Sequence, residues 1–300
     1  MATVMETTAA PREGRRRRER HPGVNQAGKQ MHGSKLTYVI LSVVVLISIF
    51  PFYWTILAAS TSNTEINKVP PNWLPGGNLF KNFHAALNNV DMGKALLNSL
   101  IVSGCVAAGT VMFSTLAGFA FAKLRFRFRN VLLGLTIGTM MVPYQLGIVP
   151  LFLLMTKLGW SDHLEAVIFP TLVSAFGVFF MRQYLLNALP DELVEAGRVD
   201  GASSLRIFIS VVLPIARPAM AVLGMLTFMA SWNDFFWPIV VLTSDNPTVQ
   251  VAIDNLGSGY VPDESIIMAG TLLGTLPVLA VFIILGRQIV GGIMQGAVKG

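Results

Sequence analysis

Residues 190–218 read PDELVEAGRVDGASSLRIFISVVLPIARP, a polar and helix-forming segment that lies between two long apolar runs. The segment contains Glu195-Ala196-Gly197, a second glycine at Gly201, and the pair Leu213-Pro214. Connections between membrane-spanning segments are usually short, so a polar connection of this length indicates a specific role.

The same segment predicts two short helices joined at a glycine corner. Pro190 suits the first helical position, and the acidic residues after it complement the positive end of a helix dipole. Gly201 can adopt a positive φ angle at a helix C-terminus, and Ser203 can cap a second helix. Pro214 and Pro218 are then expected to end that helix and to start the next apolar run. The predicted shape is a compact knob with one apolar face.

The composition is that of a membrane protein. The chain is 53% hydrophobic and only 13% charged, and its mean hydropathy is +0.61, a balance that soluble domains of this length do not normally have. The single cysteine, Cys105, excludes an intrachain disulfide. Because it lies in an apolar run, it is expected to be a small buried hydrophobic residue.

Six apolar runs are long enough to cross about 30 Å of hydrocarbon as helices. They are residues 36–59, 95–122, 131–155, 166–186, 219–243 and 265–292. The expected fold class is therefore an all-α membrane protein with six transmembrane helices. The expected division is a disordered basic tail (1–35), a first span with an outer loop (36–94), a core of five spans that includes the polar loop at 188–218 (95–292), and a tail (293–300).

The distribution of basic residues predicts the orientation. With the N-terminus inside, 18 of the 22 lysines and arginines lie in inner segments, and the loop 244–264 contains none. The positive-inside rule then places both termini and the loop 188–218 in the cytoplasm, and residues 60–94 and 244–264 outside. The run Arg15–Arg18 is expected to act as a topology anchor with some attraction to anionic lipid, with nucleic-acid binding as the alternative.

The sequence lacks the patterns of common catalytic sites. No G-x-x-x-x-G-K-[ST] phosphate-binding loop occurs, so the chain is not expected to hydrolyse ATP. The four histidines show no metal-ligand spacing, and no nucleophile–base arrangement can be argued. The chain is therefore not expected to be an enzyme, and no cofactor or metal is expected in it.

Polar groups within the apolar runs are candidates for a solute path. Asp234 is the one acid well inside a predicted span, and Pro238 removes the amide that would bond to its carbonyl, which favours a kink. Neighbouring aromatic side chains could form platforms for sugar C–H surfaces. The alternative is that the polar side chains tie helices together through hydrogen bonds. The candidates are Asn233, Asp234, Trp237 and, more weakly, Gln145.

The segment 190–218 resembles the EAA loop of importer-type ATP-binding-cassette (ABC) permeases. That pattern is Glu-Ala-Ala, three residues, Gly, nine residues, Ile, one residue and Leu-Pro. Here Gly197 replaces the third residue and Val211 replaces the isoleucine, with the spacing intact. Further stretches resemble the carbohydrate-importer branch, and specifically the smaller permease of the maltose type. They are FPFYW (50–54), LLNSLIV (96–102), FAKLRF (121–126), MMVPYQ (140–145), FFMRQYL (179–185), SWNDFFWP (231–238) and GAVKG (296–300).

The resemblance implies a type I importer fold in the cytoplasmic membrane and several partners. These are a second homologous permease, an ATPase dimer that binds ATP and Mg, and an extracytoplasmic sugar-binding protein. It also implies that the loop docks into a cleft on the ATPase. The C-terminal residues Gln295–Gly300 resemble tails that reach into the ATPase dimer. The residues that the resemblance implies for the ATPase-coupling loop are Glu195, Ala196, Gly197, Asp200, Gly201, Leu213 and Pro214.

The expected function is the permease subunit of an ATP-driven importer for a sugar or oligosaccharide, working by alternating access. One alternative is an ABC permease for a non-sugar solute such as glycerol-3-phosphate. An ion-coupled secondary transporter predicts repeated halves, which the sequence does not contain. A membrane-anchored nucleic-acid-binding or regulatory protein leaves the six spans unexplained. The sugar is left open, although residues 257–300 loosely resemble permeases for cellobiose and related β-glucosides.

Overall fold

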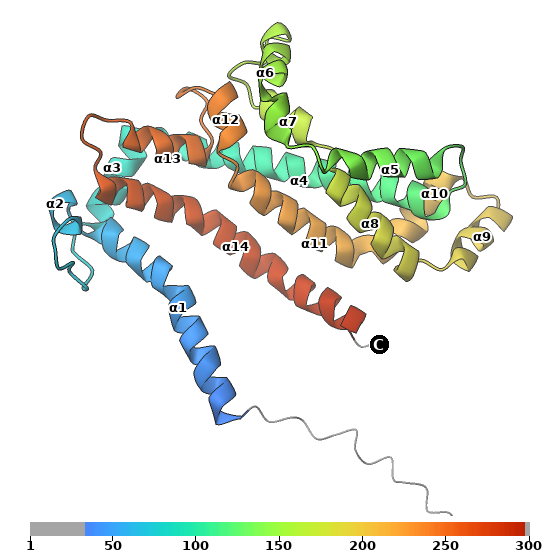
Figure 1. Ribbon diagram of the computed structural model, residues 1–300, viewed down its shortest axis with the longest axis horizontal. Coiled ribbons are helices and arrows are strands. Elements are labelled where there is room, and N and C mark those ends of the chain that lie inside the picture. The colour runs from blue at the N-terminus through green and yellow to red at the C-terminus, as the bar shows by residue number, and fades with distance from the viewer. Residues whose placement is uncertain (1–33, 298–300) are drawn as a thin grey trace, which may run out of the picture. The chain divides into compact units, whose positions relative to one another are not determined.

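The computed structural model describes residues 34–297, with side chains through Ile284. Every regular element in this part of the chain is helical (Figure 1). The elements are α1 (Lys35–Ser60), α2 (Asn63–Ile66), α3 (Leu79–Asn89), α4 (Met92–Lys123), α5 (Arg129–Thr139), η1 (Tyr144–Gly147), α6 (Ile148–Lys157), α7 (Glu165–Thr171), α8 (Ala175–Ala188), α9 (Asp191–Val199), α10 (Ser204–Ile207), the π-helical η2 (Phe208–Val212), α11 (Leu213–Trp232), α12 (Phe236–Val241), α13 (Val249–Gly257) and α14 (Glu264–Ala297). The predictions for the basic tail, including Arg15–Arg18, and for the last three residues lie outside the described residues.

The chain divides into two units between Phe50 and Pro51. The described part of the first unit is the N-terminal part of α1, whose side chains are all exposed. The second unit contains everything from Pro51 onward, and the candidate sites lie within it.

Long apolar helices occur at the predicted places, but the third and fourth predicted spans are each bent at a break, and the fifth is interrupted near its end. Within the described residues, α1, α4, the helix Ser204–Trp232 and α14 are each long and apolar enough to cross a membrane. The third predicted span consists of α5 followed by η1 and α6, bent by 90°, and the fourth of α7 and α8, bent by 42°. Counting each bent pair as one span gives up to six spans.

The breaks occur where proline or a capping side chain replaces helical hydrogen bonds. Pro143 precedes η1, so the chain leaves the α conformation there. Ser174 starts α8, where its hydroxyl accepts a hydrogen bond from the Gly177 amide at 3.1 Å.

The prediction that Pro214 and Pro218 end the second helix of the knob is wrong. The helix that begins at Ser204 continues through the π-helical turn η2 into α11 and ends only at Trp232. Pro214 lies in the first turn of α11, directly after the π-helical turn, where a missing amide costs little. The fifth span therefore starts earlier than predicted. It also ends earlier, because residues 233–235 are non-helical and separate α11 from α12, in agreement with the kink expected near Pro238.

Helices α4, α8 and α11 pack against one another at the centre of the second unit. Glycines permit the close crossing of α4 and α8. A Cβ atom added to Gly177 would lie 2.3 Å from the Ser114 Oγ, and one added to Gly118 would lie 2.9 Å from the Met181 Cβ. Such crossings allow backbones to approach closely and strengthen packing in lipid.

Helix α14 packs on α13 and α11 through a second pair of glycines. Added Cβ atoms would lie 2.7 Å from Leu256 Cδ1 at Gly270 and 2.7 Å from Val249 Cγ1 at Gly274. The Trp232 indole donates a hydrogen bond to the Gly274 carbonyl at 3.1 Å. This contact holds the C-terminal end of α11 in place.

The expectation that Cys105 is buried is wrong. Its side chain is exposed on α4, because it lies on a face that the other described helices leave uncovered. In a membrane protein such an apolar outer face is compatible with lipid, so hydrophobicity alone does not predict burial.

The glycine crossing gives a prediction for stability. Gly177→Val is expected to reduce the free energy of unfolding by about 1–3 kcal/mol, because the new side chain overlaps Ser114 in a packed interface. The matched control is Gly134→Val on α5, where an added Cβ has nothing within 4 Å. Thermal unfolding of the two purified variants measures the difference, and equal melting temperatures would contradict the proposed packing role.

Candidate functional site

The corner between α9 and α10 is a Schellman-type helix end. Gly201 has a φ angle of +75°, a conformation that side-chain-bearing residues rarely adopt. The Ala202 amide donates to the Gly197 carbonyl at 2.9 Å, and the Gly201 amide donates to the Arg198 carbonyl at 3.0 Å. The predicted glycine corner is confirmed.

The second half of the knob begins at a serine cap, as predicted. The Ser203 hydroxyl accepts a hydrogen bond from the Arg206 amide at 3.3 Å. We refer to residues 190–212 as the knob.

Buried side chains anchor the knob to the ends of the central helices. Val194, Ile207 and Phe208 are each 4% exposed or less, and they belong to the cluster that contains Phe119 of α4 and Leu185 of α8. Motion of the knob is therefore coupled to these helices by packing.

An ion pair fixes the start of the knob. Lys123, the last residue of α4, donates to the Asp191 carboxylate at 2.7 Å. This hydrogen bond, together with the positive charge of Lys123, holds the pKa of the Asp191 carboxyl below its usual value. Asp191 is also in the first turn of α9, where a negative charge complements the helix dipole.

Gly197 lies against the second half of the knob. A Cβ atom added there would be 3.1 Å from Ile207 Cγ1 and 3.3 Å from Ile207 Cδ1. The two short helices are thus in close contact at this point. The common motif has alanine here, and this chain has glycine because Ile207 fills the space that a methyl group would need.

The outward face of the knob combines apolar and charged side chains. Val199 is 87% exposed and Leu205 is 62% exposed, and Leu193 is also exposed. Glu195 and Ala196 are exposed on α9 and Asp200 is exposed at its C-cap, whereas Leu213 and Pro214 lie in the first turn of α11, beyond the π-helical turn. The motif residues therefore divide into an exposed group on α9, two glycines that shape the corner, and a pair that starts the long helix.

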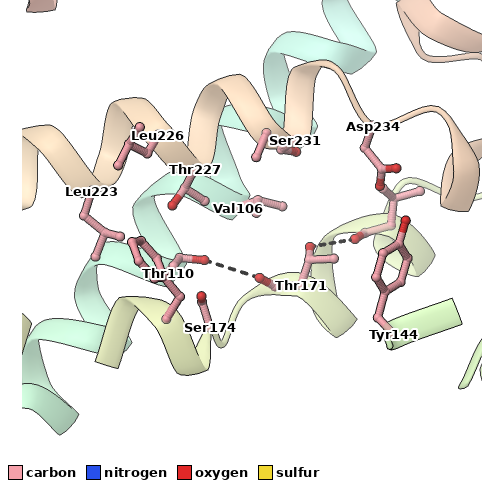
Figure 2. Close-up of a pocket in the computed structure, with 13 residues that line it drawn as sticks. Val106, Thr110, Tyr144, Thr171, Ser174, Leu223, Leu226, Thr227, Ser231 and Asp234 are labelled. Atoms are coloured by element: carbon pink, nitrogen blue, oxygen red, sulfur yellow. Dashed lines mark hydrogen bonds between the residues drawn. The ribbon is translucent and has the colours of Figure 1, made fainter. Parts of the chain in front are cut away.

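A cavity of about 650 Å³ lies among α4, α7, α8 and α11 (Figure 2). Its position follows the helix breaks, since Tyr144, Ser174 and Asp234 each lie at a break and all three line it. Non-helical backbone at membrane depth is tolerated only where it is buried in protein or lines a cavity. The lining residues are Val106, Thr110, Tyr144, Val167, Thr171, Ser174, Phe176, Leu223, Leu226, Thr227, Ala230, Ser231 and Asp234.

Some of the cavity hydroxyls are paired and others are available. The Thr110 hydroxyl donates to the Thr171 carbonyl at 3.3 Å, as Figure 2 shows. Within the described part of the chain, the hydroxyls of Thr227, Ser231 and Tyr144 have no hydrogen-bond partner. Tyr144 and Asp234 lie at the same end of the cavity, and Thr227 and Ser231 project from α11 (Figure 2).

The four candidates for the solute path have different positions. Asp234 lines the cavity, whereas Asn233 lines a separate cavity of about 250 Å³ and donates to the Met229 carbonyl at 2.8 Å. The indole of Trp237 is buried and donates to the Ala166 carbonyl at 2.9 Å, so it ties α12 to α7. Gln145 is exposed, next to Tyr144.

Several cavity residues were missed by sequence reasoning. Leu223, Thr227 and Ser231 are spaced four residues apart on α11 and therefore lie on one face of that helix. The two hydroxyl residues in this spacing could have indicated a polar edge that faces Asp234. The hydroxyls from α4 and α7 carry no such signal, because their proximity depends on how the helices pack. In the described residues, no group of three or more His, Cys, Asp or Glu side chains could hold a metal ion.

Residues 110–294 match the family model described as "Binding-protein-dependent transport system inner membrane component". The chain belongs to this family. It is a permease of the ABC transport type, and such permeases are not themselves enzymes.

Characterised relatives cover nearly the whole permease. It is 35% identical over 263 residues to the lactose transport system permease protein LacG of Rhizobium radiobacter, covering 87% of this chain and 95% of that protein. It is 32% identical over 271 residues to the arabinooligosaccharides transport system permease protein AraQ of Halalkalibacterium halodurans, covering 89% and 97%. It is also 32% identical over 267 residues to the sn-glycerol-3-phosphate transport system permease protein UgpE of Yersinia enterocolitica, covering 86% and 95%.

The fold has a solved counterpart. A chain in the crystal structure of a bacterial ABC transporter involved in the import of the acidic polysaccharide alginate matches with a TM-score of 0.73. The match covers 84% of this chain and 94% of that chain at 22% identity. The permease therefore has the ABC importer fold expected from its sequence.

The close contact within the knob gives a second prediction. Gly197→Leu is expected to open the knob, because the new side chain displaces Ile207, and a second substitution, Ile207→Ala, is expected to restore part of the structure. Hydrogen exchange of residues 190–212 measures the opening. Ala196→Leu, at an exposed neighbouring position, is the matched control, and equal exchange in both single variants would show that the contact is unimportant.

Proposed function

We propose that this chain is the smaller permease subunit of an ATP-driven importer that moves a sugar or oligosaccharide across the cytoplasmic membrane. The observation that carries the proposal is the continuous helix Ser204–Trp232, which starts in the knob and ends beside Asp234 at the cavity. Its 29 residues correspond to a rod of about 40 Å at 1.5 Å per residue. A rod of this kind can transmit a displacement of the knob to the cavity.

The knob is the proposed docking element for a separate ATPase. Its exposed apolar side chains, Leu193, Val199 and Leu205, resemble the apolar centre of a protein interface, and charged residues of both signs lie beside them. Closure of the ATPase pair would push the knob, tilt α11 and change the access to the cavity from one side of the membrane to the other. Glu195, Ala196 and Asp200 would contact the ATPase, Gly197 and Gly201 would maintain the corner, and Leu213 and Pro214 would start the rod.

The remaining parts of the importer are proposed from the family. A second homologous permease would complete the solute path, and an extracytoplasmic binding protein would deliver the substrate. ATP and Mg would be bound by the ATPase subunits. The chain is proposed to contribute only binding and movement.

A saccharide is the proposed substrate class. LacG and AraQ, by their names, transport lactose and arabinooligosaccharides, and each aligns over almost the entire length of this chain. UgpE supports glycerol-3-phosphate as an alternative substrate. The saccharide is preferred because the cavity presents hydroxyls and a carboxylate, which suit an uncharged polyol better than a phosphate.

The proposed orientation has both termini and the knob in the cytoplasm. Support comes from the 18 of 22 basic residues in the inner segments. In addition, α9 and α10 lie at one end of the second unit, and α3 and α13 lie at the other (Figure 1). The knob and the loops around α13 would therefore face opposite sides of the membrane.

Substitution of the glycine corner tests the coupling. Gly201→Val places a β-branched residue at a φ angle of +75°, at a local cost of about 1–3 kcal/mol. We expect insertion to continue while saccharide uptake collapses and the ATPase co-purifies poorly. Gly104→Val on α4, where an added Cβ has open space, is the control. Normal saccharide-stimulated ATP hydrolysis in the Gly201→Val complex would refute the docking proposal.

Cysteine labelling tests the orientation. In a Cys105→Ala background, a membrane-impermeant maleimide added to intact cells is expected to modify Tyr260→Cys and to spare Val199→Cys. Both positions are highly exposed in the permease itself. The cells express the permease without the ATPase subunits, and permeabilising them is expected to make position 199 reactive, so its protection in intact cells reflects the membrane rather than a docked partner. Labelling of position 199 in sealed cells, with position 260 protected, would reverse the proposed orientation.

A further inference from the structure

The cavity wall carries a single charged side chain, which is acidic. Of its thirteen lining residues none is lysine, arginine or histidine, and Asp234 is the single acid. The backbone amides of Phe236 and Trp237 are near the Asp234 carboxyl, which lies at the end of the cavity (Figure 2). An anionic solute would meet a carboxylate there without any compensating cation.

Several hydroxyls share the cavity with that carboxylate. Thr227 and Ser231 lie one turn apart on α11, and Tyr144 lies across from Asp234 (Figure 2). Each hydroxyl can both donate and accept a hydrogen bond, as sugar hydroxyls can. The apolar side chains Val106, Leu223 and others supply the remaining wall, and a small-molecule site typically has such a mixture of apolar walls and few polar groups.

We propose that this cavity is a binding site for an uncharged saccharide within this subunit, and that Asp234 excludes anionic solutes from it. The proposal rests on the proposed function and adds to it a site and a basis for selectivity. Its volume of about 650 Å³ is in the usual range for small-ligand sites, roughly 300–1,000 Å³.

Two other occupants fit the observations less well. A lipid acyl chain or an apolar helix of the second permease would leave the hydroxyls of Thr227, Ser231 and Tyr144 without partners, and would bury Asp234 against apolar atoms. Burial of unpaired polar groups is unfavourable, most of all for a carboxylate. A polyol satisfies all four groups.

A thiol reporter in the cavity can test the proposal without knowledge of the natural sugar. The reporter is Leu226→Cys in a Cys105→Ala background, in the complete cysteine-free complex in nanodiscs. Leu226 lines the cavity and is 44% exposed, and the control reporter, Leu87→Cys on α3, is also 44% exposed but lies outside the lining. Reaction rates are measured with three methanethiosulfonates, which carry a glucosyl, a butyl or an anionic sulfonatoethyl group. Ala230→Cys is a second reporter in the lining if Leu226→Cys does not assemble.

The glucosyl reagent is expected to react roughly fivefold faster than the butyl reagent at position 226, relative to position 87, because hydroxyl pairing holds it in the cavity. The sulfonatoethyl reagent is expected to react roughly tenfold more slowly than the glucosyl reagent, because of repulsion by Asp234.

Substitutions separate the two contributions. Asp234→Asn should raise the rate of the sulfonatoethyl reagent at position 226 until it is close to the rate at position 87. Asp254→Asn changes an exposed acid outside the lining and should leave the rate at position 226 low. Thr227→Val combined with Ser231→Ala should remove the glucosyl preference, whereas Thr55→Val on α1 should leave it unchanged.

Two results would overturn the proposal. A butyl reagent that reacts fastest at position 226 would indicate a lipid chain or an apolar helix as the occupant, and identical rate ratios at positions 226 and 87 would show no selectivity. Saccharide uptake by the unlabelled complex in proteoliposomes tests the proposed function separately. Uptake without a glucosyl preference at position 226 would refute only the cavity site, whereas a preference without uptake of any saccharide would refute the proposed function.

Discussion

The structure depends on one constraint, that backbone hydrogen-bonding groups within a membrane need partners inside the protein. Long helices satisfy most of them, and the three breaks after Thr139, Thr171 and Trp232 occur where the chain borders the cavity. Each break replaces helical hydrogen bonds and exposes a polar residue to this space, namely Tyr144, Ser174 or Asp234. The constraint that shapes the helices thus also places the polar groups of the candidate site.

The long helix from Ser204 to Trp232 relates that site to the knob. Its first turns lie in the knob, its middle packs on α4 and α8, and its last residues border the cavity. The π-helical turn before Pro214 lets the helix continue through a proline-containing stretch without ending. A knob helix that was separate from α11 could move independently of the membrane span, whereas the continuous helix moves together with it.

Sequence reasoning was most successful where local rules decide the structure. The glycine corner at Gly201 and the cap at Ser203 depend on neighbouring backbone atoms, and both were predicted correctly. Prolines were less reliable, because Pro238 accompanied a break whereas Pro214 did not interrupt its helix. Cys105 was assigned to the interior because its neighbours are apolar, although in a membrane protein the outer surface is apolar as well.

The sequence by itself determined the helical class, the apolar runs, the knob and the family, because periodicity, composition and motif spacing are local properties of the chain. Only the tertiary structure decided which polar residues share a cavity. Asp234 meets Thr227 and Tyr144 there, whereas Trp237, three residues from Asp234, is buried against α7. The reason is that the direction of each side chain after a helix break depends on packing between segments that are distant in the sequence.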